Sequence, residues 1–180
     1  MRMKFRQVFG NIKPDRKSWV VFIYSQWQST RPLRVKKDLR FYADVEGFEN
    51  LSVVTGFDDR PDMIIENYTN RAIYVIELTV GFETDITKNC IRKTARYSEL
   101  CNALKQRRNT VEYLNLSMGA IGVIGIECKK IYGFLENVMS LDIFQKNFLI
   151  RKLCGVCIRT TYILFCMRDR EWKNPELLYW

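Results

Sequence analysis

Two acidic residues, Asp62 and Glu77, border a pair of short apolar runs and could together hold a metal ion. Asp62 precedes the run 63–65, Glu77 follows the run 72–76, and the turn-prone stretch Asn-Tyr-Thr-Asn at 67–70 separates the two runs. Short runs rich in isoleucine and valine around such a turn predict a β-hairpin. Because antiparallel pairing brings the start of one strand opposite the end of the next, we expect the two carboxylates side by side.

Adjacent carboxylates repel each other, and a divalent cation with oxygen ligands would neutralise them. Magnesium typically binds one or two carboxylates together with the phosphates of a substrate. A metal held in this way polarises a phosphodiester and activates water for hydrolysis. The alternative is a hairpin that carries two solvated acids at its end and binds no metal.

The residues around this acidic pair resemble the motif of a nuclease superfamily. Arg60-Pro61-Asp62 is followed by fourteen residues and then Glu77, and a segment predicted to be helical carries Lys93 with Tyr97 four residues later. This order is similar to the endonuclease motif of the PD-(D/E)xK superfamily. Within it, the chain resembles the restriction-like endonuclease domain of site-specific non-LTR retrotransposons and of reverse-transcriptase-linked open reading frames. Further likenesses flank the motif at residues 42–45, 119–122 and 168–172.

The resemblance implies a division of the chain and a set of metal ligands. Residues 1–38 would be a basic lead-in, residues 39–172 a nuclease-like domain, and residues 173–180 a C-terminal extension. Asp62, Glu77 and the backbone carbonyl of Leu78 would bind Mg²⁺ or Mn²⁺. The catalytic residues would be Asp62, Glu77 and Lys93.

The chain departs from the superfamily pattern at Thr79. A lysine usually stands two residues after the second acid, whereas in the retrotransposon-type domains a lysine on the following helix takes this role, and Lys93 matches it. Lys93 and Tyr97 lie one helical turn apart, so they share a face that can look back at the acids. Arg92 is expected to point about a quarter-turn away, at roughly 100° per residue.

The resemblance also suggests residues that assist the catalytic set. Asp44 could be a further acid of the metal site, or an acid at the end of a strand or in a turn. Tyr97 would position Lys93 or a phosphate. The supporting residues would be Thr79, Glu83, Tyr97 and Asp44, and the DNA-binding residues would be Arg92, Arg96 and Lys88.

Composition narrows the chemistry that this chain can perform. It has 180 residues, a net charge of +9 and a pI near 9.3, which fit a polyanionic partner because lysine and arginine bind phosphate without regard to sequence. The alternative is a merely soluble basic protein. The chain contains no histidine, which excludes histidine-based triads, general bases and metal ligands. Catalysis would therefore rest on carboxylates, lysine, tyrosine, threonine, cysteine or a metal.

Six cysteines are present, and only Cys154 and Cys157 form a Cys-x-x-Cys pair. A zinc site would need a second such pair or histidines. We therefore expect six free thiols, mostly buried, in an intracellular protein. The resemblance implies a nuclear location. No run of the sequence is long and apolar enough to predict a membrane span.

The pattern of the chain predicts an α/β (α+β) domain with a restriction-endonuclease-like central mixed sheet flanked by helices. The apolar run 18–27 could be a buried strand or a short helix. The remaining expected elements are a strand at 39–45, a strand or loop at 51–54, the hairpin, one helix from Asp85 or Thr87 to about residue 106, a strand at 110–117, a turn at Gly119 and Gly122, a helix at 123–138, and one or two helices at 141–167 divided at Gly155.

Together these features predict a metal-dependent DNA endonuclease of retrotransposon type, with DNA as partner and reverse transcriptase as a further one. Two alternatives remain. One is a catalytically inactive nucleic-acid-binding remnant, whose binding would persist without metal. The other is a structural module of a larger reverse-transcriptase polyprotein.

Overall fold

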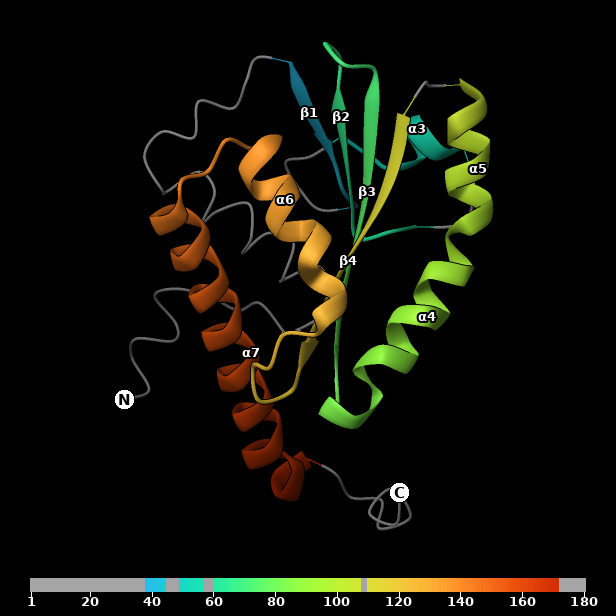
Figure 1. Cartoon of the computed structure of the whole chain (residues 1–180). Coiled ribbons are helices and arrows are strands. Elements are labelled where there is room, and N and C mark those ends of the chain that lie inside the picture. The colour runs from blue at the N-terminus through green and yellow to red at the C-terminus, as the bar shows by residue number, and fades with distance from the viewer. Residues whose placement is uncertain (1–37, 45–48, 57–59, 108–109, 172–180) are drawn as a thin grey trace.

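A four-stranded mixed sheet forms the centre of the protein, with helices on both faces (Figure 1). The computed structural model describes residues 38–44, 49–56, 60–107 and 110–171. The strands are β1 (Leu39–Tyr42), β2 (Met63–Asn67), β3 (Ala72–Gly81) and β4 (Thr110–Gly119), in the spatial order β1-β2-β3-β4. The helices are α3 (Ser52–Thr55), α4 (Ile86–Arg96), α5 (Ser98–Arg107), α6 (Lys129–Asn137) and α7 (Ile143–Glu171).

Strands β2 and β3 form the predicted antiparallel hairpin. Met63 pairs with Ile76 and Asn67 pairs with Ala72, so the residue before β2 lies opposite the residue after Ile76. The backbone N–H of Asn70 donates to the side-chain oxygen of Asn67 at 3.3 Å, which helps to close the turn. This register places Asp62 opposite Glu77, although β3 continues beyond Glu77 to Gly81.

Strand β4 runs parallel to β3 over the whole length of both strands, from Ala72 opposite Thr110 to Gly81 opposite Gly119. A parallel neighbour requires a crossover connection, and α4 and α5 supply it. Because β1 and β2 pair antiparallel, the sheet is mixed. The predicted architecture of a mixed sheet flanked by helices is confirmed.

Alternating side chains of the strands build two separate cores. On one face, Tyr74 and Leu116 pack with α6 and α7. On the other face, Ile64 and Val75 pack with Tyr42, α5 and the residues beside α3. Figure 1 shows α6 and α7 on one side of the sheet and α4 and α5 on the other. Glu77 has the same parity as Val75, so it belongs to the α4 and α5 face.

Several predicted elements differ from the structure. Residues 52–55 form the one-turn helix α3 and not a strand or loop. The single helix predicted to end near residue 106 is broken at Tyr97, whose backbone angles (φ −92°, ψ 7°) leave the helical range. Asp85 stands at the start of α4 but makes no capping hydrogen bond through its side chain.

The C-terminal half also departs from the expected boundaries. The helix predicted over 123–138 begins only with a 3₁₀ turn at Ile126 and continues as α6. Helix α7 is continuous through Gly155 because packing against the sheet outweighs the weak helix propensity of glycine. Gly122 adopts φ 85° and donates to the Gly119 carbonyl at 2.9 Å, which confirms the turn. The apolar run 18–27, the lead-in 1–37 and residues 172–180 lie outside the described residues.

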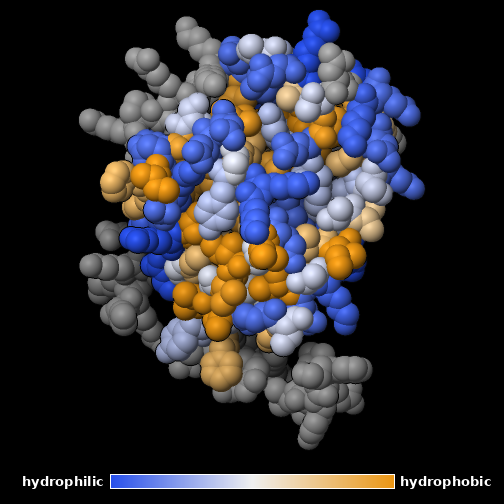
Figure 2. All heavy atoms as spheres, viewed as in Figure 1, coloured by the Kyte–Doolittle hydropathy of each residue, from blue (hydrophilic) through white to orange (hydrophobic). Residues whose placement is uncertain are grey.

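Exposed apolar side chains occur on this molecule beside a largely charged surface. In Figure 2 the hydrophobic side chains gather in the lower centre, and hydrophilic side chains surround them. The loop that connects β4 to α6 exposes Ile121 and Val123, and α7 exposes Phe144. None of the helices in the described part of the chain combines the length and the hydrophobicity that a bilayer crossing requires.

The described cysteines support the prediction of free thiols. Cys90, Cys101, Cys128 and Cys157 are buried, Cys154 is half-buried, and all five are free. Burial raises the pKa of the Cys128 thiol to about 11 and that of the Cys157 thiol to about 12. These thiols therefore stay protonated at neutral pH, which lowers their reactivity.

We expect titration of the unreduced protein to find six reactive thiols after denaturation. In the native state at pH 7 to 8, most of them should react slowly because the thiolate form is scarce and access is restricted. The measurement is the time course of modification by a thiol reagent with and without denaturant. Fewer than six thiols in denatured protein that was protected from oxidation and never treated with a reductant would contradict the prediction.

Candidate active site

Asp62 and Glu77 lie side by side, and each carboxylate accepts a hydrogen bond from a backbone N–H of the other strand end. The backbone N–H of Asp62 donates to Oε2 of Glu77 at 3.2 Å, and the backbone N–H of Leu78 donates to Oδ2 of Asp62 at 2.8 Å. The two carboxylates therefore close the end of the hairpin through main-chain donors. The predicted juxtaposition of the acids is confirmed in the fold.

Lys93 reaches the same place from α4. Its Nζ forms an ion pair with Oε1 of Glu77, and both side chains are almost fully buried, at 3% and 1% exposure. A buried carboxylate costs several kcal/mol unless a partner offsets the lost hydration. Each charge is thus the required partner of the other, and the expectation that Lys93 faces the acids agrees with this geometry.

Tyr97 holds the segment that leads into Asp62. Its hydroxyl donates to the Arg60 carbonyl at 3.1 Å, and its ring packs on Tyr113 at 5.9 Å between centroids. Burial, and then the charge of Glu77, raises the pKa of Tyr97 above its ordinary value, so the phenol remains a neutral donor. With 1% of its surface exposed, Tyr97 does not contact a phosphate, as one predicted role required.

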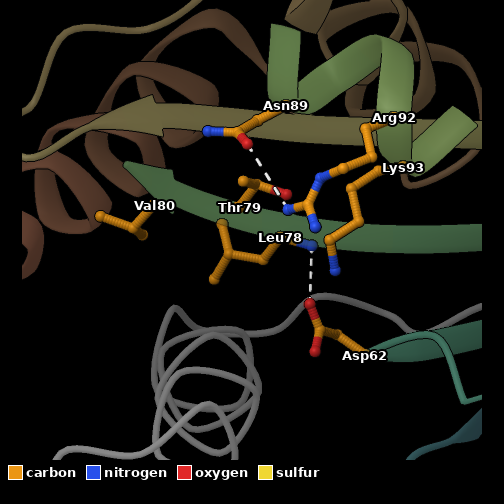
Figure 3. A pocket seen from close by; sticks show the side chains of 7 residues that line it. All are labelled: Asp62, Leu78, Thr79, Val80, Asn89, Arg92 and Lys93. Atoms are coloured by element: carbon orange, nitrogen blue, oxygen red, sulfur yellow. Dashed lines mark hydrogen bonds between the residues drawn. The ribbon is translucent and has the colours of Figure 1, made fainter. Parts of the chain in front are cut away.

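A pocket of about 170 Å³ opens in front of these residues (Figure 3). Asp62 forms one wall from the hairpin, and Arg92 and Lys93 point into it from α4. The hydroxyl of Thr79 is buried there without a hydrogen-bond partner among the described residues. The residues that line the pocket are Asp62, Leu78, Thr79, Val80, Asn89, Arg92 and Lys93.

Arg92 leaves α4 about a quarter-turn from Lys93, at roughly 100° per residue, and its long side chain still reaches the pocket. It lines the same pocket as Lys93, and its Nη2 donates to Oδ1 of Asn89 at 3.5 Å. Its side chain is exposed, whereas that of Lys93 is buried. The two side chains therefore reach the pocket at different depths.

Asp44 lies outside this pocket and pairs with the motif arginine. Nη1 of Arg60 approaches Oδ2 of Asp44 at 3.2 Å, while Oδ1 of Asp44 is buried without a hydrogen-bond partner among the described residues. The structure thus places Asp44 where it holds Arg60, and the reading of Asp44 as an acid beyond the end of a strand fits this geometry.

The other predicted supporting and basic residues occupy three different places. Oε1 of Glu83 accepts the backbone N–H of Ile121 at 2.9 Å, which ties the turn after β4 to the end of β3. The guanidinium of Arg96 lies over the Tyr97 ring at 5.4 Å from its centroid. Lys88 is exposed in the first half of α4. Neither Arg96 nor Lys88 lines the pocket.

Strand β4 contributes polar residues that the motif did not reveal. Asn115 lies opposite Glu77 and Ser117 opposite Thr79 in the parallel register, and both are buried. The Ser117 hydroxyl donates to Oδ1 of Asn115, and Nδ2 of Asn115 donates to the Tyr113 hydroxyl at 3.3 Å. Polar residues two apart inside an apolar strand were the available signal in the sequence.

The donors at the pocket are oxygen atoms, as a hard cation such as Mg²⁺ or Mn²⁺ prefers. Asp62 and Thr79 line the pocket, and Glu77 is paired with Lys93, which lines it too. In the described residues no three acidic, cysteine or histidine side chains cluster as a metal site. An ion held through Asp62 would take most of its coordination from water and substrate.

The Glu77–Lys93 pair can be tested through stability. Glu77→Gln and Lys93→Met should each lower the free energy of unfolding by about 3–5 kcal/mol, because each leaves a buried charge uncompensated. The double variant should lose less than the sum of the single losses. Chemical denaturation followed by circular dichroism gives these values.

A partly exposed pair on the same protein provides the control. Nζ of Lys146 lies 2.6 Å from Oε2 of Glu136, whose side chain is 60% exposed. Glu136→Gln should cost less than Glu77→Gln, because the Glu136 carboxylate stays largely hydrated, although the Lys146 ammonium is 10% exposed. Equal losses for Glu77→Gln and Glu136→Gln, or additive losses at Glu77 and Lys93, would show that the buried pair is not coupled.

Comparison with known proteins gives a distant likeness. No protein-family model and no curated protein matches the chain. A solved structure from a study of Toscana virus cap-snatching endonucleases is similar, with a TM-score of 0.36 and 20% sequence identity. The match covers 58% of this chain and 55% of that chain. A likeness at this level carries no argument about activity, which must come from the residues of the site.

Proposed function

We propose that this chain is a metal-dependent DNA endonuclease that hydrolyses phosphodiester bonds at the pocket beside Asp62. The observation that carries the proposal is the convergence of the hairpin acids with Lys93 of the crossover helix at one polar pocket. A hairpin that only ended in two solvated acids would need neither a buried lysine partner for one of them nor a buried, unpartnered hydroxyl nearby.

Each residue has a distinct role in this proposal. Asp62 and Glu77, with the Leu78 backbone carbonyl, would hold Mg²⁺ or Mn²⁺, which polarises a phosphodiester and activates water. Lys93 orients the Glu77 carboxylate through the buried ion pair that the two side chains form. Tyr97 keeps the strand entry at Arg60 in place through its hydrogen bond.

The charge of the protein supports DNA as the substrate. The net charge is +9, and Lys88, Arg92 and Arg96 are exposed along α4 beside the pocket. Such cations bind the phosphate backbone by neutralising charge and releasing counterions. A retrotransposon origin, a reverse-transcriptase partner and a nuclear location rest on the resemblance in sequence and belong to the proposal.

The second candidate function is DNA binding without catalysis. Both oxygens of Glu77 already have protein partners, Lys93 and the Asp62 backbone, and the side chain is 1% exposed. A carboxylate that is satisfied in this way can serve the fold alone. The two candidates differ in their dependence on metal and on Asp62.

Supercoiled plasmid DNA is the direct test. We expect nicking with Mg²⁺ or Mn²⁺ and none with a chelator. Hydrolysis at neutral pH needs an activated water, and the bound metal ion would supply it. DNA binding should persist in the chelator and fall steeply with salt. Binding without nicking under every divalent cation would favour the second candidate.

Asp62→Asn keeps the size of the side chain and an acceptor for the Leu78 N–H, so it tests the charge alone. We expect nicking to fall by at least about a hundredfold while DNA affinity stays within a few-fold. Glu77→Ala should also abolish nicking, at a larger cost in stability. Glu99→Gln, which changes an exposed acid on α5, is the matched control. Wild-type nicking by Asp62→Asn would refute the metal-site assignment.

A further inference from the structure

The pocket contains two cations, and only one of them is available to a ligand. The ammonium of Lys93 is paired with Glu77 and only 3% of its side chain is exposed. Its charge is already balanced by that carboxylate. A phosphate that enters the pocket therefore meets a lysine that is sheltered and neutralised.

Arg92, in contrast to Lys93, has a side chain that is accessible to a ligand. Its side chain is exposed, it lines the pocket, and its one hydrogen bond there is a long one of 3.5 Å to the neutral Asn89 side chain. Among the described residues, Arg92 takes part in no ion pair with an acid. Figure 3 shows it extending from α4 into the pocket beside Lys93.

The basic neighbours of Arg92 on the same helix do not share this position. Arg96 stacks on the Tyr97 ring, and Lys88 is exposed outside the pocket lining. Among the described residues of α4, Arg92 is thus the cation that lines the pocket without forming an ion pair with a carboxylate.

We infer that Arg92 binds the phosphate group of the nucleic acid inside the pocket, and that Lys93 is a positioning residue for Glu77. The inference rests on the proposed function and names the ligand contact of the same site. A guanidinium presents two parallel N–H donors to two phosphate oxygens.

Thymidine 5′-monophosphate is the probe, and thymidine is its phosphate-free comparison. Calorimetric titrations in Ca²⁺ would use the full chain and the variants Arg92→Gln, Arg92→Lys and Arg151→Gln. Arg151 is an exposed arginine on α7, so it matches the lost charge at a distance from α4. Thermal unfolding of each variant reports whether the fold is intact.

We expect Arg92→Gln to weaken binding of the monophosphate about tenfold or more, because a hydrogen-bonded charge is lost. Arg92→Lys should be intermediate, since it keeps the charge without the two parallel donors. Arg151→Gln should bind as wild type does. Wild-type affinity in Arg92→Gln, an equal loss in Arg151→Gln, or no preference of the wild type for the monophosphate over thymidine would overturn the inference.

Plasmid nicking by the same proteins separates this inference from the proposed function. If the wild type nicks DNA but Arg92→Gln binds the monophosphate as tightly as the wild type, the inference about Arg92 is wrong and the endonuclease proposal remains supported. Monophosphate binding that depends on Arg92, without nicking under Mg²⁺ or Mn²⁺, would support the phosphate contact of Arg92 and overturn the endonuclease proposal.

Discussion

The buried ion pair between Lys93 and Glu77 is the constraint on which the arrangement of the site depends. A charged carboxylate at 1% exposure is tolerated only with a partner, so α4 must lie where Lys93 reaches it. The second oxygen of Glu77 accepts the backbone N–H of Asp62. One carboxylate therefore joins β3, α4 and the residue that precedes β2.

A second hydrogen bond fixes the segment before β2 to the helical segment that contains α4 and α5. The phenol of Tyr97 donates to the Arg60 carbonyl at the point where the helical segment breaks into α4 and α5. Below the break, Leu100 and Leu104 of α5 enter the core of that sheet face. The buried members of the motif thus position the strands, and the exposed Arg92 is left to meet a ligand.

The elements with a strong local pattern could be predicted from the sequence. The hairpin and β4 follow from short apolar runs and turn residues, and the opposition of Asp62 and Glu77 follows from antiparallel register. The break at Tyr97 and the single turn of α3 could not be predicted in this way. Helix propensity varies weakly between residues, and contacts with distant segments, such as that of Tyr97 with Arg60, outweigh it.

The sequence by itself determined which chemical groups are available. Without histidine, a site here must use carboxylates, lysine, arginine and hydroxyls, and the hairpin brings two of the carboxylates together. Only the tertiary structure decided the separate positions of Lys93 and Arg92. The direction in which a residue projects from a helix follows from residue spacing. How deeply the Lys93 and Arg92 side chains are buried depends on how closely α4 packs on the sheet and on the length of these side chains. That packing buried Lys93 against Glu77 and left Arg92 exposed at the pocket.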